Sequence, residues 1–149
     1  MLFEYMTGSR YLQSDYGDPD FVLVVPPEQY LSSYVFMADP TYPETNLVLV
    51  RTRGQDQQFH DVTLDCSGII AGWQPIGSDY QYTHVDLTTG NFAAVGNCST
   101  GRHEIRSTAP FGLWVWGWGT PLTSPATSFV SYGYPGGMNV ARINDIIIQ

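Results

Sequence analysis

Short runs in which apolar and polar residues alternate recur along this chain, separated by Gly, Pro, Asn and Asp. Because successive side chains of a β-strand point to opposite faces, such alternation predicts strands with one buried face. The strongest runs cover residues 2–6, 33–37, 46–52, 60–64, 80–87, 102–107, 111–118, 128–132 and 143–148. No window shows the sustained i, i+3, i+4, i+7 apolar spacing of an amphipathic helix. The pattern therefore predicts an all-β fold, a β-sandwich of Greek-key or jelly-roll type with long loops rich in Pro and Gly.

The run at residues 111–118 carries three of the four tryptophans at alternate positions, Trp114, Trp116 and Trp118. In a strand these indoles share one face, and the apolar side chains between them occupy the other. Two interpretations stay open: a central strand covered on both faces, or an indole shelf that faces a ligand. Aromatic rings suit sugars because the C–H face of a sugar packs on a ring, and Tyr132 and Tyr134 would extend such a platform.

Composition narrows the classes of partner. The 149 residues predict one domain over 1–149. Only 13% of the residues are charged, there is no lysine, and the net charge is −8 without any basic cluster. Nucleic acid and anionic membrane are therefore not expected as partners. No apolar run approaches the roughly 20 residues of a transmembrane helix, so no such segment is expected.

The two cysteines, Cys66 and Cys98, stand in Gly-containing contexts without any zinc-type Cys/His spacing. A weakly ionic, lysine-free surface is typical of extracellular β-domains, where disulfides persist. We therefore expect one disulfide that closes a loop of about thirty residues. The alternative is two buried thiols in a cytosolic protein.

Asp15, Asp18 and Asp20 form a cluster of carboxylates on a loop with Gly and Pro. Carboxylate oxygens are calcium ligands, so the cluster is a candidate calcium site, although it lacks the order of an EF-hand. Aspartates also favour turns because they accept hydrogen bonds from nearby backbone amides. No other cofactor is expected.

The last apolar run contains Ile143, Ile146, Ile147 and Ile148. An unpaired strand of this kind promotes aggregation unless it pairs within the fold or with a neighbouring molecule. These isoleucines are therefore a candidate edge for self-association.

The three histidines are dispersed and form no metal-binding spacing. His84 could form a polar cluster with Tyr82 and Asp86 on one strand face, whereas His103 is expected to be a hydrogen-bonded core residue. No nucleophile elbow, phosphate loop or dinucleotide motif is present. We expect no catalysis, with a secreted hydrolase that uses a pair of carboxylates as the weaker alternative.

The order of segments resembles the N-terminal domain of IgGFc-binding proteins. The matching segments are residues 5–9, 17–19, 27–30, 46–50, 62–65, 101–107, 111–118 and 131–136. The last of these, Ser131-Tyr-Gly-Tyr-Pro-Gly136, is the most specific. Trp116 and Trp118 match aromatic positions of the family, whereas the position of Trp114 is usually smaller and polar.

The resemblance implies a secreted β-sandwich, the later part of a longer extracellular domain, with a role in binding or adhesion and no catalytic site to carry over. We therefore expect a non-catalytic extracellular or cell-surface binding module whose ligand is a protein or a glycan. A structural subunit of an extracellular assembly is the alternative. Trp114 is the residue whose replacement is expected to lower glycan binding without changing the melting temperature.

Overall fold

The computed structural model describes residues 2–6, 17–121 and 127–140, and its regular elements are β-strands apart from one turn of 3-10 helix. This confirms the predicted all-β class. The elements are β1 (Phe3–Met6), β2 (Asp20–Leu23), η2 (Pro27–Gln29), β3 (Leu31–Ala38), β4 (Glu44–Thr52), β5 (Val62–Leu64), β6 (Gly68–Ile69), β7 (Gln74–Ile76), β8 (Tyr80–Thr89), β9 (Ala93–Ala94), β10 (Gly101–Trp118) and β11 (Ser131–Pro135). Within these ranges, no helix is long and apolar enough to cross a membrane.

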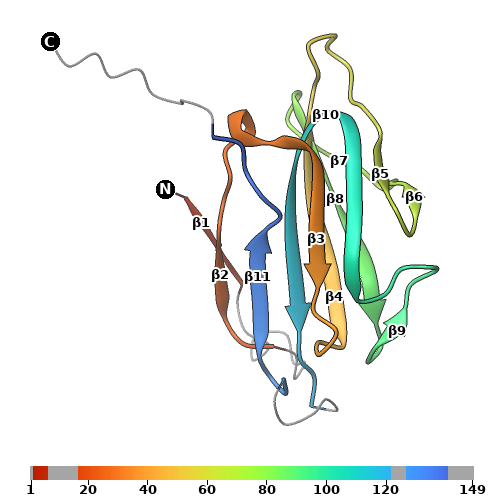
Figure 1. Cartoon of the computed structure of the whole chain (residues 1–149). Helices are drawn as coiled ribbons and strands as arrows, with labels where there is room; N and C mark the ends of the chain where they lie inside the picture. The colour runs from red at the N-terminus through yellow and green to blue at the C-terminus, as the bar shows by residue number, and fades with distance from the viewer. Residues whose placement is uncertain (1, 7–16, 122–126, 141–149) are drawn as a thin grey trace, which may run out of the picture.

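The central element is β10, whose 18 residues pair with four other strands. Its first half lies between β3 and β5, and its second half lies between β4 and β11, all antiparallel. The register with β3 shifts between Arg106 and Phe111, where Pro110 also stands. Strands commonly pass from one sheet to another at such irregular points. The single strand β10 thereby joins two halves of a strongly curved sheet (Figure 1).

The main core lies on the inner face of this curved sheet. Leu47 and Leu49 of β4, Ile105 of β10 and Leu87 of β8 are fully buried there. The alternation predicted for residues 80–87 is confirmed, since the side chains that alternate with Tyr82 and His84 point inward. Phe111 and its alternate neighbours on β10 belong to the same cluster. Both halves of β10 thus contribute to one apolar core.

A second, smaller core covers the outer face of β10. Trp114 and Trp116 pack there with Tyr30, with Val22 of β2 and with Val25, which follows β2. The two-stranded sheet of β1 and β2 lies against this side of the larger sheet (Figure 1). At Trp114 and Trp116, the strand is therefore covered on both faces, which confirms the first of the two interpretations for these two indoles.

Glycines face aromatic rings across the β10–β11 pair. Trp116 lies opposite Gly133, and Gly117 lies opposite Tyr132. A Cβ atom on Gly133 would collide with the Trp116 ring, and one on Gly117 would collide with the Tyr132 ring. The two rings lie on opposite faces of the sheet, because adjacent residues of a strand alternate. The repeated Trp-Gly and Tyr-Gly steps thus allow a large ring to lie flat over its neighbouring strand.

The strands β2, β6, β7 and β9 were not predicted, and two of the predicted runs differ clearly from the observed strands. Residues 101–118 form one strand rather than two. Pro110 does not interrupt this strand, because it stands where the register with β3 shifts and where a backbone N–H is not needed for pairing. The strand predicted at residues 128–132 is observed at Ser131–Pro135. The run at residues 143–148 lies outside the described residues.

Candidate functional site

Trp114 is sealed inside the second core. Its side chain is 4% exposed, its indole Nε1 donates to the carbonyl oxygen of Leu23 at 3.0 Å, and its ring meets Tyr30 edge-on. The expectation that Trp114 is the exposed, ligand-facing indole is therefore wrong. Because β2 covers it and satisfies its N–H, replacement by alanine would leave a cavity and lower the melting temperature.

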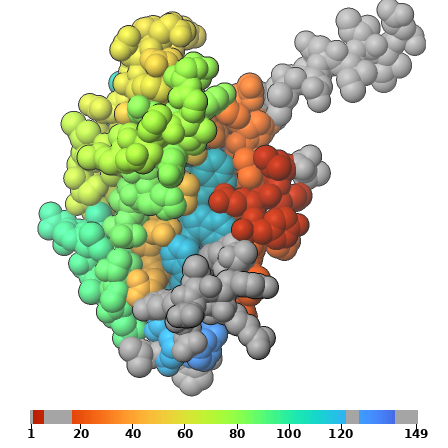
Figure 2. All heavy atoms as spheres, turned by 180° about the vertical axis from the view of Figure 1, so that it is seen from behind, coloured from red at the N-terminus to blue at the C-terminus, as the bar shows by residue number. Residues whose placement is uncertain are grey.

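Trp116 and Trp118 line a small hollow on the same outer face. The hollow has a volume of about 160 Å³, and its other walls are Glu4, Val48 and His84, together with Asn46. In the space-filling view, β10 is visible at the bottom of a depression between β8 and β1 (Figure 2). Trp118 is only partly buried, so it is the tryptophan of β10 with the most accessible surface. We call this feature the indole hollow.

The wall of the indole hollow is not purely apolar. The side-chain oxygen of Asn46 is buried and accepts no hydrogen bond from the described residues. Glu4 and His84 add a carboxylate and an imidazole to the rim, and the His84 ring meets Tyr82 edge-on at 5.9 Å. An apolar floor with a few polar groups at its edge is the usual composition of a ligand site.

Tyr132 and Tyr134 do not extend the indole face. They lie opposite Gly117 and Val115 across the β10–β11 pair, and their rings pack against the main core. The predicted platform of three indoles and two phenols is therefore wrong, because the register puts the phenols on the opposite face of the sheet. Burial raises the pKa of both phenols, and their hydroxyl groups bond to the backbone of β3 and of the residue after it.

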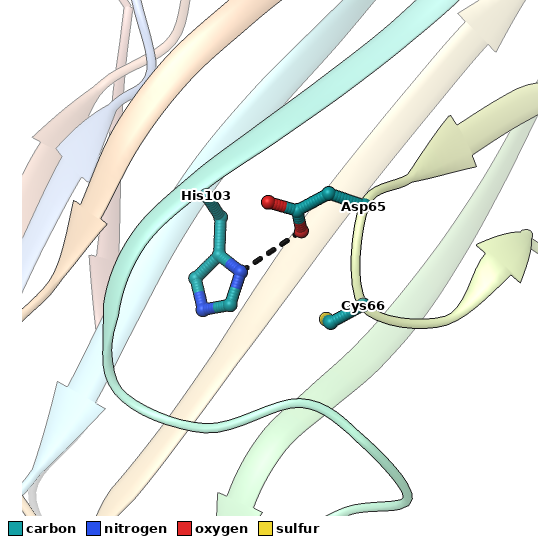
Figure 3. Close-up of side chains that lie close together, drawn as sticks. All are labelled: Asp65, Cys66 and His103. Atoms are coloured by element: carbon teal, nitrogen blue, oxygen red, sulfur yellow. Dashed lines mark hydrogen bonds and ion pairs between the residues drawn. The ribbon is translucent and has the colours of Figure 1, made fainter.

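The predicted disulfide joins Cys66 to Cys98. Beside it, the buried His103 places Nδ1 2.9 Å from Asp65 Oδ1 (Figure 3). Its Nε2 lies 2.8 Å from the carbonyl oxygen of Ser99. This confirms His103 as a hydrogen-bonded core residue. Both partners are acceptors, so only the doubly protonated imidazole can donate to both at once.

Asp65, Cys66 and His103 are close enough for their ligating atoms to lie within 4.8 Å of one another. The sulfur of Cys66 is committed to the disulfide, and both ring nitrogens of His103 are engaged. Burial would raise the pKa of the Asp65 carboxyl, but hydrogen bonds from His103 and from the Glu104 and Cys66 amides hold it below its usual value. The cluster therefore fastens the loop of Asp65 to β10 rather than offering open metal positions.

The candidate calcium cluster is described only in part, because Asp15 lies outside the described residues. The Asp18 backbone exchanges hydrogen bonds with the Ser131 hydroxyl, and the Asp20 carboxylate accepts one from the Phe21 amide. Calcium binding stays a prediction. The edge formed by Ile143, Ile146, Ile147 and Ile148 also lies outside the described residues.

Sequence reasoning missed Glu4, Asn46 and His84 as companions of the tryptophans. Asn46 pairs with Trp116 in the β4–β10 ladder and with Asp86 in the β4–β8 ladder, so the hollow depends on the order of the strands. Asn46 and Val48 are two residues apart in the sequence, and this spacing does predict that they share one face of a strand. Nothing in the sequence indicates that β4 lies between β8 and β10.

Comparison with known proteins identifies the family. A family model described as IgGFc binding protein matches residues 1–117. Searches of curated proteins and of solved structures gave no match. The matched region contains both halves of β10 as far as Gly117, the disulfide and most of the indole hollow. This chain belongs to the IgGFc-binding protein family.

Proposed function

We propose that this chain is a non-catalytic extracellular binding module, and that a side chain of a protein ligand enters the indole hollow. The observation that carries the proposal is the partly exposed Trp118 beside Trp116 in a hollow of about 160 Å³ with polar groups on its rim. Tryptophans in small desolvated pockets are frequent centres of binding energy at protein interfaces. The disulfide supports an extracellular location, since disulfides persist in oxidising compartments.

The family description names the Fc part of immunoglobulin G as a ligand, so purified Fc is the first protein to test. We expect Trp118→Ala to weaken binding of a protein ligand about tenfold or more, the effect of a central interface tryptophan. Phe92→Ala is the matched control, because Phe92 is an exposed aromatic residue on the β8–β9 turn, outside the hollow. Binding is measured by biolayer interferometry, and the folding of each variant by its melting temperature.

The same variants separate a protein ligand from a glycan. If Fc and a panel of extracellular proteins do not bind, but a glycan array shows binding that Trp118→Ala removes, the hollow takes a sugar and the protein-ligand proposal fails. If both Trp118→Ala and Phe92→Ala bind like the wild type, the hollow is not the site.

A second candidate function is assembly with other copies of the chain. Among the described strands, β3 pairs only with β10, so its other edge carries backbone groups without a partner strand. The exposed Val35 and Met37 stand on this strand, and edge strands of this kind readily pair with another chain. Size-exclusion chromatography with light scattering tests this function: filaments or large oligomers support assembly, and a monomer at high concentration excludes it.

A further inference from the structure

A second concave surface lies at the bend of β10, and we call it the Arg106 groove. It has a volume of about 540 Å³, and its walls include Phe59, His60 and Asp61 from the loop before β5, and Arg106 and Thr108 from β10. None of its lining residues lines the indole hollow. The groove therefore offers a second binding surface with its own chemistry.

Arg106 stands apart from the other described arginines. The guanidinium of Arg51 donates to Gln81 and to the His60 carbonyl, and that of Arg53 donates to two carbonyls. Arg102 pairs with Glu104. Arg106 is exposed, and its guanidinium makes no hydrogen bond or ion pair with any described residue. In a chain of net charge −8, an uncommitted guanidinium in a groove favours a carboxylate, which it can bind through two parallel hydrogen bonds.

His60 organises a hydroxyl group beside this cation. Its Nε2 lies 3.1 Å from Asp56 Oδ1, and its Nδ1 lies 2.9 Å from the hydroxyl of Thr108. Hydrogen bonds from the Gln58 amide and then from His60 lower the pKa of the Asp56 carboxyl, which is the acceptor opposite Nε2. In the tautomer that carries its proton on Nε2 alone, the ring accepts the proton of the Thr108 hydroxyl at Nδ1. The lone pairs of Thr108 Oγ1 stay available to accept a hydroxyl of a ligand.

Asp61 decides which kind of anion fits. Asp61 lines the same groove as Arg106, and its negative charge would repel a bare inorganic anion. A ligand that carries hydroxyl groups as well as a carboxylate can instead donate hydrogen bonds to Asp61. Phe59 supplies an apolar wall, and its ring is fixed by the guanidinium groups of Arg53 at 4.5 Å and Arg51 at 5.4 Å.

We propose that the Arg106 groove binds an acidic sugar residue, with its carboxylate on Arg106 and its hydroxyl groups on Asp61 and Thr108. The apolar C–H surface of the sugar contacts Phe59. This combination of one cation, one carboxylate, one ordered hydroxyl group and an aromatic wall matches a polyhydroxylated carboxylate. The groove is separate from the indole hollow, so the inference goes beyond the proposed function and does not depend on it.

The test uses the full chain and four probes: glucuronate, N-acetylneuraminate, glucose and inorganic phosphate. Binding is followed by NMR chemical-shift titration, which also shows where each probe binds. We expect both acidic sugars to bind and to shift the signals of Phe59 and Thr108. We expect glucose and phosphate to bind about tenfold more weakly, because glucose lacks the carboxylate and phosphate lacks the sugar ring with its hydroxyl groups.

Four variants make the test specific. Arg106→Gln is expected to weaken acidic-sugar binding about tenfold or more, the loss expected for a charge-assisted pair. Arg102→Gln is the matched control on the same strand and outside the groove, and it should bind like the wild type. Asp61→Asn should weaken binding of the acidic sugars and strengthen binding of phosphate.

The proposal is overturned by any of three results: phosphate binds as tightly as the acidic sugars, neither acidic sugar binds, or folded Arg106→Gln keeps the affinity of the wild type. Trp118→Ala should leave this binding unchanged, so the two proposed sites succeed or fail separately.

Discussion

The hydroxyl group of Tyr134 holds both backbone groups of Met37 at the open edge of β3. It accepts from the Met37 amide at 3.1 Å and donates to the Met37 carbonyl at 2.6 Å. The Tyr132 hydroxyl accepts from the Asp39 amide at 3.1 Å, just beyond the end of the same strand. Two side chains of β11 thereby occupy backbone groups that a further strand would otherwise pair with.

Removing the Tyr134 hydroxyl should weaken the fold and open this edge. We expect Tyr134→Phe to lower the free energy of unfolding by about 1 kcal/mol, the usual net value of a hydrogen bond. We also expect a higher fraction of dimer or larger species, because the Met37 backbone becomes free to pair. Urea denaturation and light scattering measure the two effects. Tyr5→Phe is the control, since Tyr5 is 72% exposed. Equal stability and mass for the two variants would show that the hydroxyl does not seal the edge.

The buried tyrosines predict a loss of stability in alkaline solution. Burial is the largest cause that raises the pKa of five phenols, those of Tyr30, Tyr34, Tyr42, Tyr132 and Tyr134. Their folded pKa lies above the unfolded value of about 10, so the folded state keeps the protons more tightly. The stabilising effect is complete below about pH 10 and is lost as the pH rises through the folded pKa values.

The melting temperature is measured from neutral pH to well above the pKa of the phenols in the unfolded chain. It should stay constant at first and then fall. The part of the tyrosinate absorbance that comes from these phenols should rise together with unfolding rather than before it. A melting temperature that stays level across the whole range, with early ionisation of all phenols, would contradict the expectation.

The contact between Gly133 and Trp116 should be sensitive to one methyl group. We expect Gly133→Ala to cost about 1–3 kcal/mol of unfolding free energy, because the added Cβ collides with the indole. In Trp116→Leu the ring is absent, so adding Gly133→Ala should cost less there than in the wild type. A double-mutant cycle in urea measures this coupling, and additive effects would mean that the two residues do not meet.

The disulfide should contribute a large part of the stability. Its two cysteines are 32 residues apart in sequence, and the chain-entropy model gives about 3–4 kcal/mol for a loop of this size. Cys66→Ser combined with Cys98→Ser should lower the unfolding free energy by about this amount. The reduced wild type serves as the comparison. A double variant as stable as the oxidised protein would rule out this contribution.

The Asp65 carboxylate should make the fold sensitive to acid. Its folded pKa is lowered, so it stabilises the fold above the unfolded value of about 3.9, and the effect is lost as the pH falls through the folded pKa. Asp65→Asn should be less stable than the wild type near neutral pH and similar to it in strong acid. Thermal melts across the acidic range test this. Parallel curves for the two proteins would mean that the pair with His103 is not linked to folding.

Alternation in the sequence predicted the longer strands and which of their side chains face the core, because a strand has a fixed period of two. It did not predict β2, β6, β7 and β9, which are only two to four residues long. It placed Ile105 and His103 on one inward face, and both are buried. It also placed the indoles on one face of their strand. What alternation cannot give is the neighbour of each strand, and this is where the prediction of the binding platform went wrong.

The misplacement of Tyr132 and Tyr134 shows the physical reason. Whether a residue of β11 shares a face with Trp116 depends on a register that a shift of one residue would reverse. The observed register puts Gly133 opposite Trp116 and so sends both phenols to the other side. The Arg106 groove was hidden for a related reason, because Phe59 and Arg106 are distant in sequence and meet through the β5–β10 pair.

The position of β10 has a consequence for how the chain folds. The partners of this strand come from residues as far apart as Leu31 and Pro135, so its ladders close long loops whose entropy must be overcome before they form. We infer that folding is slow for a chain of this size and limited by the arrival of β10 and β11, which are made after β3, β4 and β5. Until then, the earlier strands have exposed edges and apolar faces, and the nascent chain depends on protection from aggregation.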